Sequence, residues 1–135
     1  MAIEKTYNMI KPDGVANGHI GEIITRIERV GLKIERMELA NVTMEEAKAN
    51  YAEHEGKPFY DGLIEYITSG SVVKMVVSGE NAVATMRKLM GATNCAEASP
   101  GTIRGDFGLT VDHNVIHGSD SVESAEREIK VFFGA

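Results

Sequence analysis

The positions of apolar and polar residues along the chain predict an alternation of strands and helices. Apolar residues recur at helical spacing from Ile20 to Val30, and Gly31 follows at the position of a helix C-terminal cap. Residues 72–77 are nearly all apolar, which is typical of a strand buried on both faces. Further strands are predicted over residues 4–10 and 32–42, and helices over residues 43–53, 58–67, 82–90 and 122–133.

Three stretches interrupt this pattern. Residues 11–14 (KPDG) are predicted to form a turn, and residues 92–113, rich in Gly, Thr, Ser and Pro, a long loop of the kind that is often functional. Residues 114–121 (NVIHGSDS) begin as a short buried strand containing a histidine and continue with small polar residues that can start a helix. Asp120 and Glu123 have the spacing of a capping box.

The predicted elements reduce to the order β-α-β-β-α-β when the two short central helices are set aside. This order is typical of the ferredoxin-like α+β architecture, in which a four-stranded antiparallel sheet carries helices on one face. A chain of 135 residues supports one core, so residues 1–135 are expected to form a single domain.

Composition narrows the class of protein. The formal net charge of -6 argues against nucleic acid as the main ligand, because backbone binding needs a basic face. No apolar run approaches the length of a membrane span, so no membrane association is expected. Cys95 is the single cysteine and the first residues lack a signal-peptide pattern, which together predict a cytoplasmic location.

The candidate chemistry centres on His117, which is predicted to lie at a strand end beside a helix N-terminus. Such a place favours a phosphate, and a neutral imidazole there is a candidate nucleophile for phosphoryl transfer. Lys11, Arg87 and Arg104 stand near breaks in the predicted structure and could neutralise a triphosphate. The alternative for each of these four residues is a packed or surface side chain, and only their convergence in space favours a site.

Other candidates have two interpretations. Phe59 on its predicted helix is either a core aromatic or a platform for a nucleobase. Glu128, two turns into the last helix, is either a surface charge or a carboxylate that orients the imidazole. His19, His54 and His113 lack comparable context and are interpreted as surface or structural residues.

Four separate motifs make the chain resemble the nucleoside diphosphate kinases. They are residues 114–121 (NVIHGSDS), 11–14 (KPDG), 87–94 (RKLMGATN) and 100–107 (PGTIRGDF), and they occur in the family's order within a resemblance that extends from Lys5 to Phe133. The family is ferredoxin-like. Its members move the γ-phosphate of a nucleoside triphosphate to a nucleoside diphosphate by a ping-pong mechanism through a phosphohistidine, with broad base and sugar tolerance.

The resemblance also implies roles for individual residues. His117 would be the nucleophile, with Ser119 and Glu128 orienting the imidazole and Lys11 completing the catalytic set. The implied nucleotide-binding residues are Lys11, Arg87, Thr93 and Arg104 at the phosphates, Tyr51 and Asn114 along the site with Lys11 and Asn114 near the sugar, and Phe59 and Val111 on either side of the base. The implied cofactor is Mg²⁺, held mainly by the nucleotide phosphates with no protein ligand. The implied partners are ATP, other nucleoside di- and triphosphates, and further copies of the chain in a dimer-based hexamer.

The chain departs from the common family pattern at several places. Cys95 replaces a frequent proline and is expected to loosen the long loop and to add a reactive thiol. Asp112-His113 replaces a Gly-Arg pair, which puts local affinity or subunit packing in question. Ser71 and Val77-Ser78 replace proline and Trp-Glu, and both changes are expected to be tolerated.

Two other functions stay open. A non-catalytic member of the same fold would bind nucleotide or protein partners, although the joint presence of His117, Lys11, Arg104 and Glu128 argues against it. An RNA-binding module shares the β-α-β-β-α-β order, but it needs a basic face and exposed sheet aromatics, and this chain is acidic.

Overall fold

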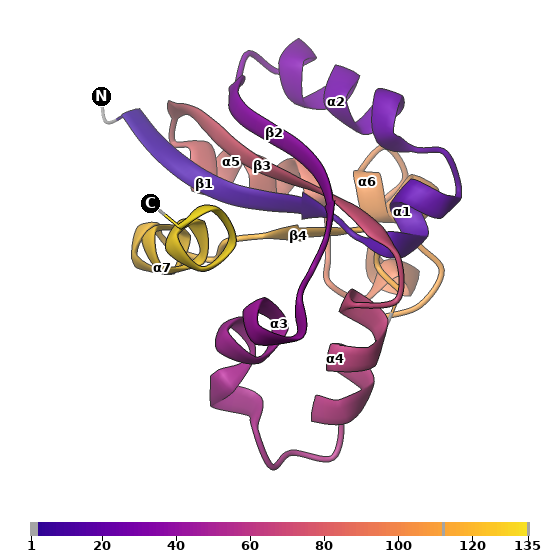
Figure 1. The fold of residues 1–135 in the computed structure, drawn as a ribbon. Coiled ribbons are helices and arrows are strands. Elements are labelled where there is room, and N and C mark those ends of the chain that lie inside the picture. Colours follow the sequence, from indigo (N-terminus) through magenta and orange to yellow (C-terminus); the bar gives the residue numbers. More distant parts are fainter. Residues whose placement is uncertain (1–2, 112, 135) are drawn as a thin grey trace.

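The computed structural model describes residues 3–111 and 113–134, and its core is a four-stranded antiparallel sheet of order β2-β3-β1-β4 (Figure 1). This order and the βαββαβ connectivity confirm the ferredoxin-like α+β prediction. The strands are β1 (Ile3–Ile10), β2 (Lys33–Asn41), β3 (Ser71–Glu80) and β4 (Ile116–Gly118).

The helices cover both faces of this sheet, whereas the sequence predicted helices on one face only. They are α1 (Pro12–Ala16), α2 (Ile20–Arg29), α3 (Met44–Asn50), α4 (Tyr60–Ile67), α5 (Ala82–Met90), α6 (Ile103–Phe107) and α7 (Val122–Phe133), with 3-10 turns η1 (Ala52–His54) and η2 (Cys95–Glu97). On one face Met75 and Val77 of β3 pack with α2, α5 and α6. On the other face Val72 and Tyr7 pack with α3, α4 and α7, so the helices added to the basic frame close a second core.

Several predicted boundaries are wrong, and at the starts of α1 and α7 the cause is local. The predicted turn at 11–14 is the start of α1, because Pro12 stands at the first helical position, where its missing N–H is not needed. The Thr43–Glu46 capping box that opens α3 is confirmed. The predicted box at Asp120 is wrong, since the Ser121 hydroxyl caps α7 instead by accepting from the Ser124 N–H.

The long loop contains two short helical turns that the sequence pattern did not predict. The Asn94 side chain accepts from the Ala96 N–H at the start of η2, and the Thr102 hydroxyl accepts from the Gly105 N–H at the start of α6. Elements of three and five residues are too short to show a 3.6-residue period, so their caps are the sequence signals that indicate them.

The arrangement of the ends of the strands positions the site. β4 lies beside β1, and three residues separate the end of β4 from the start of α7. Figure 1 shows α3 and α4 standing away from the sheet as a pair, joined at the far end by the segment after η1. None of the helices within residues 3–111 and 113–134 is both long and apolar enough to cross a membrane.

Candidate active site

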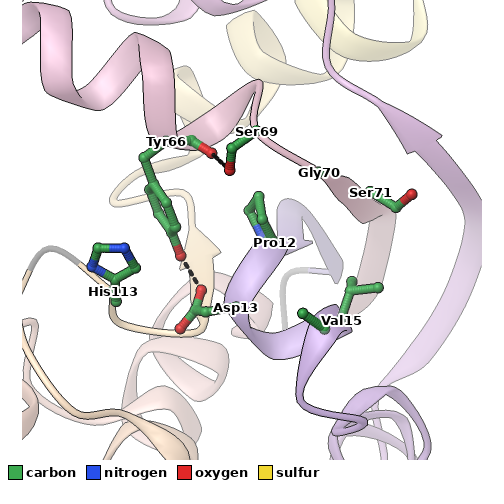
Figure 2. Close-up of a pocket in the computed structure, with 9 residues that line it drawn as sticks. Pro12, Asp13, Val15, Tyr66, Ser69, Gly70, Ser71 and His113 are labelled. Atoms are coloured by element: carbon green, nitrogen blue, oxygen red, sulfur yellow. Dashed lines mark hydrogen bonds between the residues drawn. The ribbon is translucent and has the colours of Figure 1, made fainter.

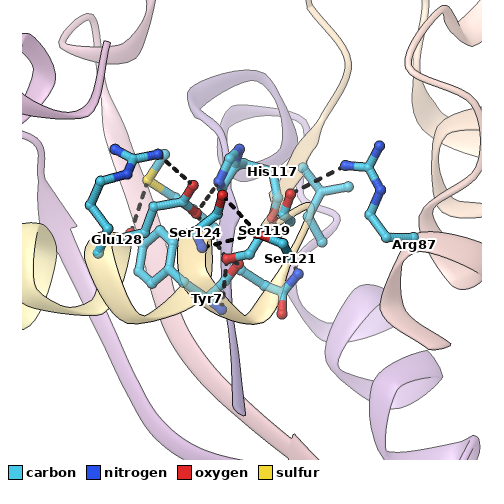
Figure 3. Close-up of polar contacts among 12 residues, drawn as sticks. Tyr7, Arg87, His117, Ser119, Ser121, Ser124 and Glu128 are labelled. Carbon is cyan, nitrogen blue, oxygen red and sulfur yellow. Dashed lines mark hydrogen bonds and ion pairs between the residues drawn. The ribbon is translucent and has the colours of Figure 1, made fainter. Parts of the chain in front are cut away.

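The central feature is a hydrogen-bonded row of three side chains from β4, the turn after it and α7 (Figure 3). Nε2 of His117 lies 2.6 Å from Oε1 of Glu128, and the Ser119 hydroxyl donates to the same oxygen at 2.9 Å. Glu128 is 4% exposed. Because a carboxylate only accepts hydrogen bonds, this contact puts the ring hydrogen on Nε2 and leaves the lone pair of the neutral imidazole on Nδ1.

Two further contacts fix this row. Oγ of Ser119 accepts from the Tyr7 N–H at 3.2 Å, which ties the row to β1. The Arg127 guanidinium lies 3.5 Å from the second oxygen of Glu128. The carboxylate therefore has partners on both oxygens, and the ring of His117 is held from one side while its side chain keeps 22% exposure.

His117 opens into a cavity of about 550 Å³ that gathers cations from distant segments. Lys11 follows β1 and donates from Nζ to the Asn114 side chain at 2.7 Å. Burial and the nearby Arg104 guanidinium lower the pKa of Lys11 to about 8. Arg87, on α5, donates to the Gly118 carbonyl at 3.3 Å and is otherwise exposed. The cavity therefore offers three cations around one imidazole, which suits phosphate oxygens.

Arg104 differs from the other two cations because it is 4% exposed. Its Nε, Nη1 and Nη2 donate to the carbonyls of Asn114 (3.2 Å), Gly91 (3.1 Å) and Ile116 (2.7 Å). A guanidinium has five N–H donors, so two are left for a ligand. Burial lowers the pKa of Arg104 to about 10, which keeps it charged at neutral pH. Arg104 thus ties the long loop to the start of β4 and supplies positive charge at the wall of the cavity.

The backbone just before His117 is strained. Val115 has a φ of +74°, which is rare for a β-branched residue, and Ile116 N–H bonds to the Asn114 carbonyl at 2.8 Å across it. The Lys11 N–H donates to the Val115 carbonyl at 2.7 Å, and Asp13 accepts from the Val115 N–H at 3.1 Å. The predicted strand therefore starts one residue later than its β-branched pattern indicated.

An apolar slot of about 510 Å³ adjoins this cavity and shares Leu63 and Val111 with it. Phe59, which immediately precedes α4, and Val111 of the long loop both line the slot, and each is about half exposed. The slot thus pairs an aromatic ring from one segment with an aliphatic side chain from another. An opening with these walls suits a flat ring system.

The structure brings nearly all the sequence-predicted site residues together. Ser119 lies behind the cavity and Phe59 lines the adjoining slot. The predicted residues that line the cavity itself are Lys11, Tyr51, Arg87, Thr93, Arg104, Val111, Asn114, His117 and Glu128. The Asn114 amide also donates to the Thr93 carbonyl at 3.2 Å, and burial raises the pKa of Tyr51 to about 12, so its hydroxyl stays protonated.

The sequence interpretation missed other residues of this cavity. Asp120, Ser124 and Arg127 line it from the end of β4 and from α7, and His54 lines it from η1. On α7, Ser124 precedes Arg127 by three residues and Glu128 by four, and that spacing was a usable signal. His54 carries no such signal, because it reaches the cavity only through the way α3 and α4 pack.

The structure gives different outcomes for three other residues that the sequence analysis singled out, Cys95, His19 and His113. The Cys95 thiol is buried and donates to the Thr110 carbonyl, and burial raises its pKa, so the expectation of a reactive thiol is wrong. His19 stacks on Phe107 with ring centroids 4.2 Å apart, which confirms a structural role. His113 lines the apolar slot. Asp112 lies outside the described residues.

Comparison with known proteins agrees with this geometry. The family model for nucleoside diphosphate kinase matches residues 4–135. The chain is 60% identical over 131 residues to a nucleoside diphosphate kinase of Staphylococcus epidermidis, covering 97% of this chain and 88% of the relative. It is 59% identical to that of Archaeoglobus fulgidus, covering 97% of this chain and 87% of the relative.

Solved structures give the same result. A nucleoside diphosphate kinase of Halobacterium salinarum in complex with CDP superposes with a TM-score of 0.95 at 50% identity, covering 99% of this chain and 90% of that one. The enzyme of Aquifex aeolicus gives a TM-score of 0.94 at 38% identity, covering 98% and 96%. These matches define an enzyme that transfers phosphate between nucleotides. The chain belongs to the nucleoside diphosphate kinase family.

Proposed function

We propose that the chain, as one domain, transfers the γ-phosphate of a nucleoside triphosphate to a nucleoside diphosphate by a ping-pong reaction through His117. The observation that carries this proposal is the 2.6 Å contact between Nε2 of His117 and Glu128, which leaves Nδ1 as the nucleophilic nitrogen beside the cation-lined cavity.

The reaction has two balanced steps. The Nδ1 lone pair forms a bond to the γ-phosphorus while the bond from that phosphorus to the β,γ-bridging oxygen breaks, and the nucleoside diphosphate leaves. A terminal oxygen of a second diphosphate then forms a bond to the phosphorus and the N–P bond breaks. The ring becomes positively charged when Nδ1 is phosphorylated, and the Glu128 carboxylate stabilises that charge through the retained Nε2 hydrogen.

The phosphates bind among Lys11, Arg87, Thr93 and Arg104. Burial, together with Arg104 beside Lys11 and Arg87 beside Arg104, disfavours the charge on Lys11 and on Arg104, and bound phosphates relieve that cost. Donor and acceptor nucleotides use the same cavity in turn, so one site serves both half-reactions.

The nucleoside lies toward the apolar slot, with Tyr51 and Asn114 along the site. Lys11 and Asn114 lie near the sugar, and Phe59 and Val111 lie on the two faces of the base. Stacking is insensitive to the identity of the base, which supports broad base tolerance. The relative from Halobacterium salinarum was solved with CDP, and this supports nucleoside diphosphates as ligands of this chain as well.

Mg²⁺ enters with the nucleotide phosphates in this proposal. Among residues 3–111 and 113–134, no group of three or more His, Cys, Asp or Glu side chains could hold a metal ion. The carboxylates of Asp120 and Glu53 line the cavity and are suited to contact a phosphate-bound ion through its water shell. Hydrogen bonding from the Ser124 hydroxyl lowers the pKa of Asp120, so it is ionised at neutral pH. When bound, Mg²⁺ neutralises phosphate charge during transfer.

We also propose a cytoplasmic, dimer-based hexamer. The strand β2 is an outer strand of the sheet formed by the described residues, and Met37 and Leu39 on it are exposed. An exposed outer strand with apolar side chains is a ready template for pairing with a second copy. Light scattering tests the hexamer, and a stable monomer or tetramer would contradict it.

Intact mass measurement after brief mixing with ATP and Mg²⁺ tests the reaction. We expect one added phosphoryl group that survives at alkaline pH, is lost in acid, is absent from His117→Ala, and is discharged by GDP to give GTP. His19→Ala is the matched control, because that ring stacks on Phe107 outside the cavity. A folded protein that takes up no phosphoryl group would favour the non-catalytic, nucleotide-binding alternative.

A further inference from the structure

The apolar slot has little hydrogen-bonding capacity. Its lining residues are Pro58, Phe59, Gly62, Leu63, Tyr66, Val111 and His113. Within this set only Tyr66 and His113 carry polar side-chain atoms. Among the side chains of the slot, these two are therefore the ones that can distinguish a ligand by hydrogen bonds.

The hydroxyl of Tyr66 is already engaged. It donates to one carboxylate oxygen of Asp13, and the other oxygen accepts from the Val115 N–H at 3.1 Å. Figure 2 shows the Tyr66 hydroxyl directed at Asp13, with His113 beside the ring. Burial and the Asp13 carboxylate raise the pKa of Tyr66, so the hydroxyl keeps its hydrogen and remains bound to Asp13.

His113 is held in place without using its ring nitrogens. Its backbone N–H donates to the Thr110 hydroxyl at 3.1 Å. Its ring packs against Tyr66 with the centroids 4.5 Å apart and the planes tilted by 57°. Neither ring nitrogen has a hydrogen-bond partner within residues 3–111 and 113–134, and the residue is exposed. A neutral imidazole offers one donor and one acceptor, and here both are available to a ligand.

We propose that His113 is a base-selecting residue, whose imidazole hydrogen-bonds the edge of a nucleobase stacked between Phe59 and Val111. The inference rests on the proposed function, since it assumes that nucleoside diphosphates occupy the cavity and the slot. Stacking treats all bases alike, but their edges differ, because adenine and cytosine carry amino donors where guanine and uracil carry carbonyl acceptors. His113 therefore adds a modest base preference to an otherwise tolerant site.

Calorimetric dissociation constants of the unphosphorylated full chain test this proposal. The ligands are ADP, GDP, CDP and UDP, with ribose 5-diphosphate as the base-free reference. His113→Phe keeps a flat ring against Tyr66 but removes both hydrogen-bonding atoms, and His113→Gln keeps a donor and an acceptor. His19→Phe is the matched control for the same chemical change away from the slot.

We expect the wild-type chain to bind its preferred diphosphate about 2- to 10-fold more tightly than the others, which is the range of one neutral hydrogen bond. His113→Phe brings the four constants to within about twofold of one another, His113→Gln restores a spread, and the constant for ribose 5-diphosphate does not move. The proposal is overturned by four equal constants in the wild type, by an unchanged spread in His113→Phe, or by a matching loss for ribose 5-diphosphate. Failure of every diphosphate to bind the wild type would instead refute the proposed function.

Discussion

Replacing Glu128 with glutamine is the sharpest test of the proposed mechanism. The change keeps the length of the side chain and an oxygen that can accept from Nε2 of His117, but it removes the negative charge. The Ser119 hydroxyl can still donate to that oxygen. The variant therefore separates the charge of Glu128 from its shape.

The size of the effect follows from the contact. A hydrogen bond to a charged group contributes about 1.5–3 kcal/mol and a neutral one about 0.5–1.5 kcal/mol, so the change removes about 1–2 kcal/mol. Glu128 is 4% exposed, and salt screens a buried pair little. The imidazole of His117 gains positive charge as its N–P bond forms, so this difference falls mainly on the transition state. We expect phosphorylation of His117 by ATP to slow by about 5- to 30-fold.

A single-turnover rapid-quench experiment, stopped by alkali, measures the rate of His117 phosphorylation. Urea unfolding of the same proteins measures their stability. Glu126→Gln is the matched control, because Glu126 is an exposed glutamate on the same helix. A phosphorylation rate within about twofold of the wild type, with an unchanged urea midpoint, would refute the charge-stabilisation argument.

Three further predictions address other parts of the structure. Because burial lowers the pKa of Lys11 to about 8, the side chain loses its charge as the pH rises through that value. Calorimetry should show that ADP binds more weakly above pH 8, and that the affinity of Lys11→Arg, which stays charged, falls less steeply with pH. Lys74→Met should lower the urea-unfolding free energy by about 1–3 kcal/mol, because buried Lys74 pairs with Glu46 at 3.2 Å and donates to the last turn of α7. A variant as stable as the wild type would contradict this prediction. Val115→Gly should change the urea-unfolding free energy by no more than about 1 kcal/mol, because relief of the positive φ offsets the lost burial. Val72→Gly in β3 is the control and should lose about 3 kcal/mol, so equal losses in the two variants would show that Val115 stores no strain.

Elements with a regular apolar period or a complete cap could be predicted from the sequence. Residues 72–77 lie within β3, and the Thr43–Glu46 box opens α3 as predicted. The prediction failed where a helical element is too short to repeat its apolar period. η2 and α6 are three and five residues long, and their caps at Asn94 and Thr102 are local signals that an interpretation based on periodicity overlooks.

The residues of the candidate site also fall into those that the sequence predicts and those that it does not. His117 was suggested by its immediate neighbours in the chain, and the motifs gave the residues around it. His54 and His113 were interpreted as surface or structural residues, because the sequence around them shows no pattern. Their positions depend on the way that η1 and the long loop pack beside α4, and such contacts between separate segments leave no trace in a single sequence.

The strained backbone at Val115 explains why the motifs at residues 11–14 and 114–121 belong to one site. A β-branched residue favours an extended conformation, so the sequence alone predicts a plain strand there. The Lys11 N–H and the Asp13 carboxylate instead hold both polar backbone groups of Val115, and they impose the φ of +74°. The same segment carries the Lys11 ammonium, while the residue two positions after Val115 is His117. The contact that strains the backbone therefore also sets the imidazole in the same cavity as the Lys11 ammonium, and a change that frees Val115 without moving His117 would separate these two consequences.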